Sequence, residues 1–507
     1  METTRSRPIC YHEIWGVPNE RKESEVKIAF VSSEIAPFAS TGGLGEVSGS
    51  LTRALVKQGA TVVRIMPMYR QVLEGNWSVR DTGRRLRIPV GYRVHTAEIW
   101  TDDQPECPTV FIRRDEYFDR RELYALPERE YSDNLERFIF FQKTVVAWLD
   151  ETGWGADVVH GNDWTSGLLP FYLRYGITGS GRTGSEAMVF TVHNLAYQGI
   201  YPGADFPLTN LPFDCFSIDG LEFYGNINCL KGGLTQSHMV TTVSPTYAQE
   251  VRTPEFGCGL DGVLRTLGDR FVGILNGLDE ERWNPAQDRF LVNTYDARDI
   301  SGKRACKHDL LRRTGLGGRP ERALAGIISR MVDEKGFDLL AEAMPRLVEM
   351  PLDVVILGKG TEKYHRLASE WMQRWPGRVW ARIGYDEPLA HQIQAGADIF
   401  LMPSRIEPCG ISQMCAIRYG TLPIVHATGG LKDTVKNLSD DGRSGNGIAF
   451  GDFTVDAFLA AIQRALTLYG TDVWAEIVHR LLQEKNDWER PAREYLEVYG
   501  RALSLRK

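Results

Sequence analysis

The stretch KIAFVSSEIAPFASTGGLGEVSGSLTRALVKQGATVVRIM, residues 27–66, decides the fold of this chain. An apolar run at 26–32 predicts a buried strand, and a second run at 61–66 predicts another. Between them, apolar residues recur at helical spacing from Val47 to Leu55. A strand, a helix and a strand in this order form a βαβ unit, whose strands are parallel and joined by a right-handed crossover.

The same alternation continues along the chain. Apolar runs at 109–112, 157–160 and 188–192 predict three more strands, and residues 78–101 alternate as an antiparallel insertion does. From residue 323 the pattern restarts, with a predicted helix at 337–350 and predicted strands at 325–329, 352–357, 379–383, 398–402 and 423–425. The pattern therefore predicts two doubly wound α/β sheets.

Turn dipeptides separate the two halves. Asn276-Gly277 and Asn284-Pro285 punctuate the chain between them, so we expect the hinge near 276–284. The expected parts are a polar N-terminal extension, a first Rossmann-like domain, a second Rossmann-like domain and a C-terminal helix, at residues 1–25, 26–276, 277–485 and 486–507. Ligands of such sheets bind at the carboxyl ends of the strands, which predicts where the site lies.

The composition bounds the functional class. The 507 residues are too many for one ordinary domain, and 43% hydrophobic with 25% charged residues is typical of soluble globular proteins. A net charge of −7 argues against nucleic acid or an anionic membrane as a main partner. No apolar run approaches the roughly 18 residues that a membrane helix needs. The eight cysteines contain no CxxC pair and the first 25 residues no hydrophobic signal core, which indicates a reduced, cytoplasmic protein.

Long strings in a fixed order carry a family resemblance. They are TVHNLAYQG (191–199), LKGGL (230–234), TTVSPTYAQEV (241–251), GLDGVL (259–264), GILNGLD (273–279), SRMVDEKG (329–336), PSRIEPCGISQ (403–413) and GTLPIVHATGGLKDTV (420–435). With these strings the chain resembles the bacterial and plant glycogen (starch) synthases from about residue 27 to its end. The resemblance implies the glycosyltransferase B fold, in which two Rossmann-like doubly wound domains face a central cleft and a C-terminal helix crosses back to the first domain.

The resemblance also implies an activity. Members of this family are hexosyltransferases that move glucose from a nucleotide-glucose to the non-reducing 4-hydroxyl of an α-1,4-glucan. They retain the anomeric configuration and need no metal or other cofactor. The partners expected from the resemblance are ADP-glucose and a glucan such as glycogen, with no nucleic acid and no membrane; the oligomeric state stays open.

The glycine turn around residues 40–46 is the first candidate site. Residues without a Cβ let backbone N–H groups approach an anion closely, and the helix that follows adds its positive N-terminus. A tight strand-to-helix turn that binds nothing is the alternative. By resemblance Gly42 and Gly43 contact the donor. The family has a lysine at the position of Ser40 and an aspartate at that of Glu46, so this turn lacks a cation.

The missing positive charge is expected from the second domain. Arg330 follows a predicted strand and Lys335 precedes a predicted helix, and both would stabilise charge on a leaving diphosphate. By resemblance they form the diphosphate-binding pair, and Glu407 lies beside the donor glucose and steadies developing positive charge. The structural alternatives are a surface cation pair and a glutamate that complements a helix N-terminus.

Two further candidates end strands of the first domain. His193 follows the strand at 188–192, and by resemblance it contacts the donor sugar. Asp163 follows the strand at 157–160 and is expected to bind sugar hydroxyls or to position the acceptor, with a capping aspartate as the alternative. Asn162 stands where the family has a second histidine.

The resemblance also supplies a donor-binding set. Tyr385 is expected to pack on the nucleotide base, with a core tyrosine as the alternative. The glycine turn at 428–431 is expected to meet the phosphates and glucose of the donor. The whole set comprises Ser40, Gly42, Gly43, Asn276, Tyr385, Cys409, Gly410, Ile411, Thr428, Gly429, Gly430 and Leu431.

Three other functions stay open. A transferase of the same fold could use UDP-glucose or another acceptor. Ser40, Asn162 and Cys258, where the family has a histidine, also fit a glucan-binding regulatory protein that has lost activity. A dinucleotide oxidoreductase is disfavoured, because the first turn reads Gly-Gly-x-Gly rather than Gly-x-Gly-x-x-Gly.

Overall fold

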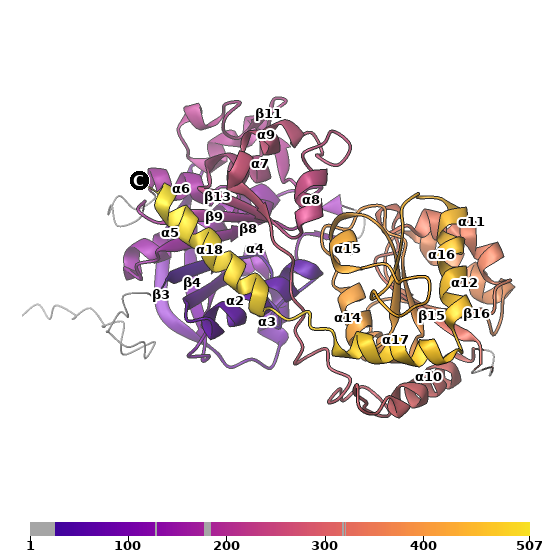
Figure 1. Ribbon diagram of the computed structural model, residues 1–507. Coiled ribbons are helices and arrows are strands. Elements are labelled where there is room, and N and C mark those ends of the chain that lie inside the picture. The colour runs from indigo at the N-terminus through magenta and orange to yellow at the C-terminus, as the bar shows by residue number, and fades with distance from the viewer. Residues whose placement is uncertain (1–25, 127–128, 177–183, 317–318, 320, 507) are drawn as a thin grey trace, which may run out of the picture. The chain divides into compact units, whose positions relative to one another are not determined.

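The computed structural model describes residues 26–126, 129–176, 184–316, 319 and 321–506 (Figure 1). The expected extension at 1–25 lies outside these residues. The chain forms two compact units. The first comprises Met1–Thr242, Glu250–Ile274 and Glu489–Lys507, and the second comprises Val243–Gln249 and Leu275–Trp488. No helix in the described part of the chain is both long and apolar enough to cross a membrane.

The first unit is built on a nine-stranded sheet in the order β14-β13-β9-β8-β1-β2-β5-β4-β3. Its parallel strands are β1 (Lys27–Val31), β2 (Thr61–Pro67), β5 (Thr109–Arg113), β8 (Val158–Asn162), β9 (Ala187–Val192), β13 (Met239–Thr242) and β14 (Phe271–Gly273). The helices of this unit are α2 (Gly43–Lys57), α3 (Arg70–Glu74), α4 (Asp115–Phe118), α5 (Asn134–Thr152), α6 (Leu169–Tyr175), α7 (Cys229–Gln236), α9 (Asp261–Thr266) and α18 (Glu489–Leu505). Short strands complete it: β6 (Ala125–Leu126), β7 (Arg129–Glu130), β10 (Ile200–Pro202), β11 (Glu222–Phe223) and β12 (Asn226–Asn228).

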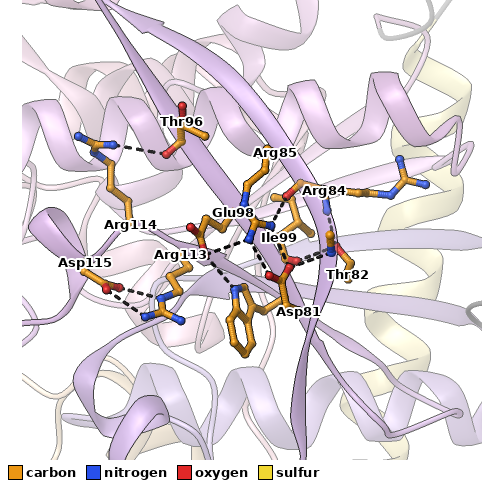
Figure 2. A network of polar contacts seen from close by, with 12 residues as sticks. Asp81, Thr82, Arg84, Arg85, Thr96, Glu98, Ile99, Arg113, Arg114 and Asp115 are labelled. Carbon is orange, nitrogen blue, oxygen red and sulfur yellow. Dashed lines mark hydrogen bonds and ion pairs between the residues drawn. The ribbon is translucent and has the colours of Figure 1, made fainter.

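The expected antiparallel insertion is confirmed as the edge of this sheet. Strand β3 (Val79–Val90) pairs with β4 (Arg93–Asp102), which pairs antiparallel with β5. Charged side chains cover this region (Figure 2): Arg85 forms a two-pronged contact with Asp81 at 2.9 and 2.6 Å, and Arg113 does so with Asp115 at 2.8 and 3.0 Å. Such exposed pairs add little stability, but charge along an edge strand discourages pairing with another chain.

The C-terminal helix α18 belongs to the first unit. It packs against α2, β9 and β13, and Figure 1 shows it as the yellow helix lying along that unit. Its buried face presents Tyr495 and Tyr499, and the Tyr499 hydroxyl lies 2.8 Å from Nδ1 of His160 on β8. The other ring nitrogen of His160 lies 2.6 Å from Oγ1 of Thr191, so the buried ring has a polar partner on each side.

The second unit has a six-stranded parallel sheet in the order β17-β16-β15-β18-β19-β20. Its strands are β15 (Ala323–Ile328), β16 (Leu352–Gly358), β17 (Val379–Ile383), β18 (Ile399–Met402), β19 (Leu422–His426) and β20 (Ile448–Phe450). The helices are α8 (Pro245–Glu250), α10 (Ser301–Thr314), α11 (Phe337–Leu347), α12 (Glu362–Arg374), α13 (Glu387–Gly396), α14 (Ser412–Arg418), α15 (Gly429–Thr434), α16 (Val455–Leu468) and α17 (Asp472–Gln483). Strands β15, β16, β18 and β19 are apolar and almost wholly buried, as expected of a parallel sheet covered on both faces.

The units differ from the expected domains at one internal segment and by a few residues at two boundaries. Residues 243–249 group with the second unit, although the sequence placed them in the first. The reason is a contact within that unit, because Thr246 donates to the carboxylate of Asp433 from its backbone N at 2.9 Å and from Oγ1 at 2.6 Å. The observed changes of unit fall at 274/275 and 488/489, a few residues from the expected ones.

Candidate functional site

In the second unit, the candidate residues lie at the carboxyl ends of three neighbouring strands. Strand β15 leads into the segment with Arg330 and Lys335, β18 leads to Glu407, and β19 leads to the glycine turn at 428–431. Because β15, β18 and β19 are adjacent in a parallel sheet, these three segments share one edge. This edge brings together side chains that are far apart in the sequence.

The centre of this edge is an ion pair. Nζ of Lys335 lies 2.8 Å from Oε1 of Glu407, and the two side chains are only 12% and 10% exposed. The Ser404 hydroxyl donates to the other carboxylate oxygen, Oε2, at 3.0 Å. Glu407 is therefore held in place at both oxygens, with one charged partner and one neutral partner.

Two glycines allow this close arrangement. Gly429 has φ +45°, and a Cβ there would lie 2.0 Å from the carbonyl oxygen of Glu407. Gly336 has φ +74°, and a Cβ there would lie 1.8 Å from the carbonyl oxygen of Pro403. Gly430 then donates its backbone N–H to the carbonyl of Glu407 at 3.1 Å. The loop that carries the carboxylate therefore packs directly on the second glycine turn.

The remaining candidates of this unit fall into three groups, which are exposed, buried together, or placed in the loops before two helices. Arg330 has a 45% exposed side chain that lies 3.2 Å from Glu334, and Tyr385 is 81% exposed beyond the end of β17, which rules out a core tyrosine. Asn276 and Cys409 are buried together; burial raises the pKa of the Cys409 thiol to about 12, and hydrogen bonds from Asn276 oppose this. Gly410, Ile411, Thr428 and Leu431 lie in the loops before α14 and α15 and at the start of α15.

The glycine turn of the first unit contains a residue that the sequence reasoning missed. Glu34 is buried, and its carboxylate accepts the Thr41 hydroxyl at 2.8 Å and the Tyr124 hydroxyl at 2.7 Å. Its other oxygen accepts the backbone N–H of Thr41 at 2.5 Å. This N–H group is therefore already paired within the protein, and the backbone of Gly42 also hydrogen-bonds to Glu34. Gly42 and Gly43 are exposed residues at the start of α2. The available signal was a carboxylate two residues beyond a predicted strand.

Ser40 lies close to this turn without replacing the missing cation. Its hydroxyl donates to the carbonyl of Gly42 at 3.1 Å. A Cβ on Gly45 would come within 2.5 Å of that hydroxyl, so Ser40 packs tightly over the first turn of α2. The position is half-buried, which leaves the end of a longer side chain a route to solvent.

Asp163 and His193 meet at the ends of β8 and β9. Oδ1 of Asp163 accepts the backbone N–H of His193 at 2.7 Å. Asp163 also precedes the short 3₁₀-helix Trp164–Ser166, but its side chain makes no capping hydrogen bond there, so the capping interpretation is wrong. Asp163 also has φ +54°, a left-handed conformation that is uncommon outside glycine. Burial raises the pKa of Asp163 to about 7 and lowers the pKa of His193 to about 3, so the imidazole is neutral at physiological pH.

Family models match both halves of the chain. The model described as "Starch synthase catalytic domain" matches residues 27–266, and the one described as "Glycosyl transferases group 1" matches residues 313–480. Together with the two Rossmann-like units, these matches define a glycosyltransferase of the B fold. The sucrose-phosphate synthase of Thermosynechococcus elongatus shares that fold alone, with a TM-score of 0.58 at 18% identity over 94% of this chain and 99% of its own.

Closer relatives define the family. "Glycogen synthase 2" of Geobacter sulfurreducens is 40% identical over 95% of this chain and 100% of its own length, and the glycogen synthase of Syntrophotalea carbinolica is 37% identical over 95% and 99%. The structure of the catalytic domain of starch synthase IV from Arabidopsis thaliana, bound to ADP and acarbose, has a TM-score of 0.89 at 32% identity, covering 95% of this chain and 100% of that one. The chain therefore belongs to the glycogen and starch synthase family of glucosyltransferases.

Proposed function

We propose that this enzyme elongates glycogen by transferring glucose from ADP-glucose to the non-reducing 4-hydroxyl of an α-1,4-glucan, with retention of configuration. The observation that carries the proposal is the arrangement of Lys335, Glu407 and Ser404 at the carboxyl edge of the second sheet. ADP is favoured as the nucleotide because the starch synthase IV structure to which this chain is similar holds ADP. We also propose that the enzyme acts in the cytoplasm, as expected from the sequence.

The residues take separate roles in this proposal. Arg330 and Lys335 neutralise the leaving diphosphate, which would replace Glu334 and Glu407 as the partners of these cations. Glu407, partly released from Lys335, faces the positive charge that develops on the sugar. His193 contacts the donor glucose, and Asp163 holds the backbone of His193 in place.

Incorporation of labelled glucose into a glycogen primer, measured with ADP-glucose and UDP-glucose in parallel, tests the proposal. We expect faster transfer from ADP-glucose and no release of free glucose. Preference for UDP-glucose would replace the donor assignment and leave the reaction type standing. No transfer from either donor, combined with retained glycogen binding, would instead support a binding protein on a synthase scaffold.

A further inference from the structure

Asn162 contacts two different kinds of group at once. Its side chain lies at the end of β8, where Nδ2 donates to the backbone carbonyl of Val31 at 3.0 Å. Its Oδ1 lies 2.9 Å from Nε2 of His193. The contact with Val31 is buried, and the contact with His193 is partly buried.

The polarity of these contacts can be assigned without seeing a hydrogen atom. The carbonyl of Val31 can only accept, so the amide nitrogen of Asn162 has to face it. The amide oxygen then faces His193, and since that oxygen can only accept, Nε2 of His193 has to carry a proton. Flipping the amide would set two acceptors against each other at 3.0 Å from Val31.

The ring of His193 is therefore restricted to one tautomer. With the proton on Nε2, a neutral imidazole has a bare lone pair on Nδ1. Among the described residues, none is seen to hydrogen-bond to Nδ1. Asp163, which follows Asn162 in the chain, accepts the backbone N–H of His193, and Asn162 contacts its ring. Two consecutive residues therefore hold both the backbone and the side chain of this histidine.

We infer that Asn162 is a positioning residue that holds His193 in the Nε2–H tautomer, so that Nδ1 acts only as a hydrogen-bond acceptor toward a hydroxyl group of the sugar substrate. The part of this inference that concerns the sugar rests on the proposed function. An acceptor at this point selects substrates that carry a hydroxyl there, because a deoxy or fluoro analogue has no proton to donate. The titratable groups near His193 are His160, whose charge interacts with that of the His193 ring, and Asp163, which binds the His193 backbone and interacts in turn with Glu34.

The tautomer can be tested without any activity. Long-range ¹H–¹⁵N spectra of the full chain labelled with ¹⁵N-histidine report which nitrogen carries the proton, and His193→Gln assigns the signal. We expect His193 to be neutral with the proton on Nε2 from pH 8 down to pH 5, and Asn162→Leu to give a mixture of tautomers. A proton on Nδ1 in the wild type, or a ring that titrates in this range, overturns the inference even if glucose transfer fails.

Activity tests the consequence of the tautomer. We expect Asn162→Leu to lower kcat by roughly 10- to 100-fold with a smaller change in KM, at unchanged pH dependence. Asn162→His restores the family residue. Its ring can donate to Val31 and accept from His193 only while it is neutral, because a protonated imidazole has no acceptor. We therefore expect it to recover activity at pH 8 and to lose it toward pH 6. Tyr499→Phe, which removes a contact of His160 on the same strand, is the matched control and leaves the pH profile unchanged.

The outcomes separate the two proposals. If wild-type protein transfers no glucose while the spectra show the Nε2–H tautomer, the proposed function fails and the positioning role of Asn162 stands. If wild type is active, but Asn162→Leu folds normally and keeps kcat within twofold, the positioning role fails and the proposed function stands.

Discussion

Nζ of Lys335 and Oε1 of Glu407 lie 2.8 Å apart, although 72 residues separate them along the chain. Both side chains are mostly buried, so each is the main compensation for the charge of the other. Under the proposed function this pair serves both catalysis and folding stability, so single substitutions in it test both.

We expect Glu407→Ala and Lys335→Ala each to lower kcat by about 100-fold or more, because each removes charge stabilisation of the transition state. Each also leaves a buried charge without its partner, which costs about 3 kcal/mol of folding stability. The double variant Lys335→Met/Glu407→Gln should recover much of the stability and none of the activity. Glucose transfer and urea unfolding measure the two effects.

The control for this series is Glu370→Ala, an exposed residue on α12. It should change neither quantity. Near-wild-type turnover in either single variant would remove Lys335 and Glu407 from the proposed site.

Glu34→Gln tests the buried carboxylate at the first glycine turn. The two carboxylate oxygens accept three hydrogen bonds from Thr41 and Tyr124. Glutamine replaces one of these oxygens with an NH₂ group, which cannot accept and would face a donor. We expect a loss of about 1–3 kcal/mol of folding stability and a raised KM for the sugar nucleotide. Tyr124→Phe, which removes one of the three bonds, is the graded comparison. Unchanged KM with lost stability would confine Glu34 to folding.

Ser40→Lys restores the cation that the family carries in this turn. An added ammonium near a bound diphosphate should lower KM for ADP-glucose about tenfold, equivalent to roughly 1.4 kcal/mol, and the gain should shrink in high salt. Ser185→Lys adds the same charge at another exposed position of the first unit and serves as the control. A KM that does not respond to Ser40→Lys would mean that the donor phosphates do not approach this turn.

Asp163→Asn should change how stability depends on pH. Burial raises the pKa of Asp163 to about 7, above the value of about 3.9 in an unfolded chain. The folded state therefore favours the protonated form, and this contribution is complete below about pH 4 and is lost as the pH rises through 7. Asparagine has nearly the same shape as aspartate and keeps the acceptor for the His193 N–H group.

The measurement is the difference in unfolding free energy between Asp163→Asn and wild type across pH 4–8. We expect the variant to gain on wild type with a slope of up to about 1.4 kcal/mol per pH unit between pH 4 and 7. A difference that is constant over this range would contradict a raised pKa at Asp163.

Much of the architecture could be predicted from local pattern. The run from Lys27 to Met66 predicted a parallel βαβ unit, and β1, α2 and β2 form it. The alternation at 78–101 predicted an antiparallel pair, which β3 and β4 form. The spacing of apolar residues and the positions of turn residues are local features that span about ten residues. Such local features are enough to decide whether a segment forms a helix or a strand.

The same rules place polar residues at strand ends without saying what they touch. Arg330 was predicted to follow a strand, and it does so; Glu407 and the turn at 428–431 also follow strands. Their meeting depends on the strand order β15-β18-β19, which packing of the whole sheet decides. Glu34 was missed for the same reason, since its partner Tyr124 lies 90 residues away.

The sequence by itself determined the two α/β sheets, the family and the residue types at the ends of their strands, because these follow from local periodicity and from ordered motifs. Only the tertiary structure decided that Lys335 pairs with Glu407, that Glu34 accepts a hydrogen bond from Tyr124, and that Asn162 contacts the ring of His193. Each of these contacts joins segments far apart in the chain or depends on the direction of a single hydrogen bond. Such contacts are set by strand order and side-chain packing, and no window of neighbouring residues encodes them.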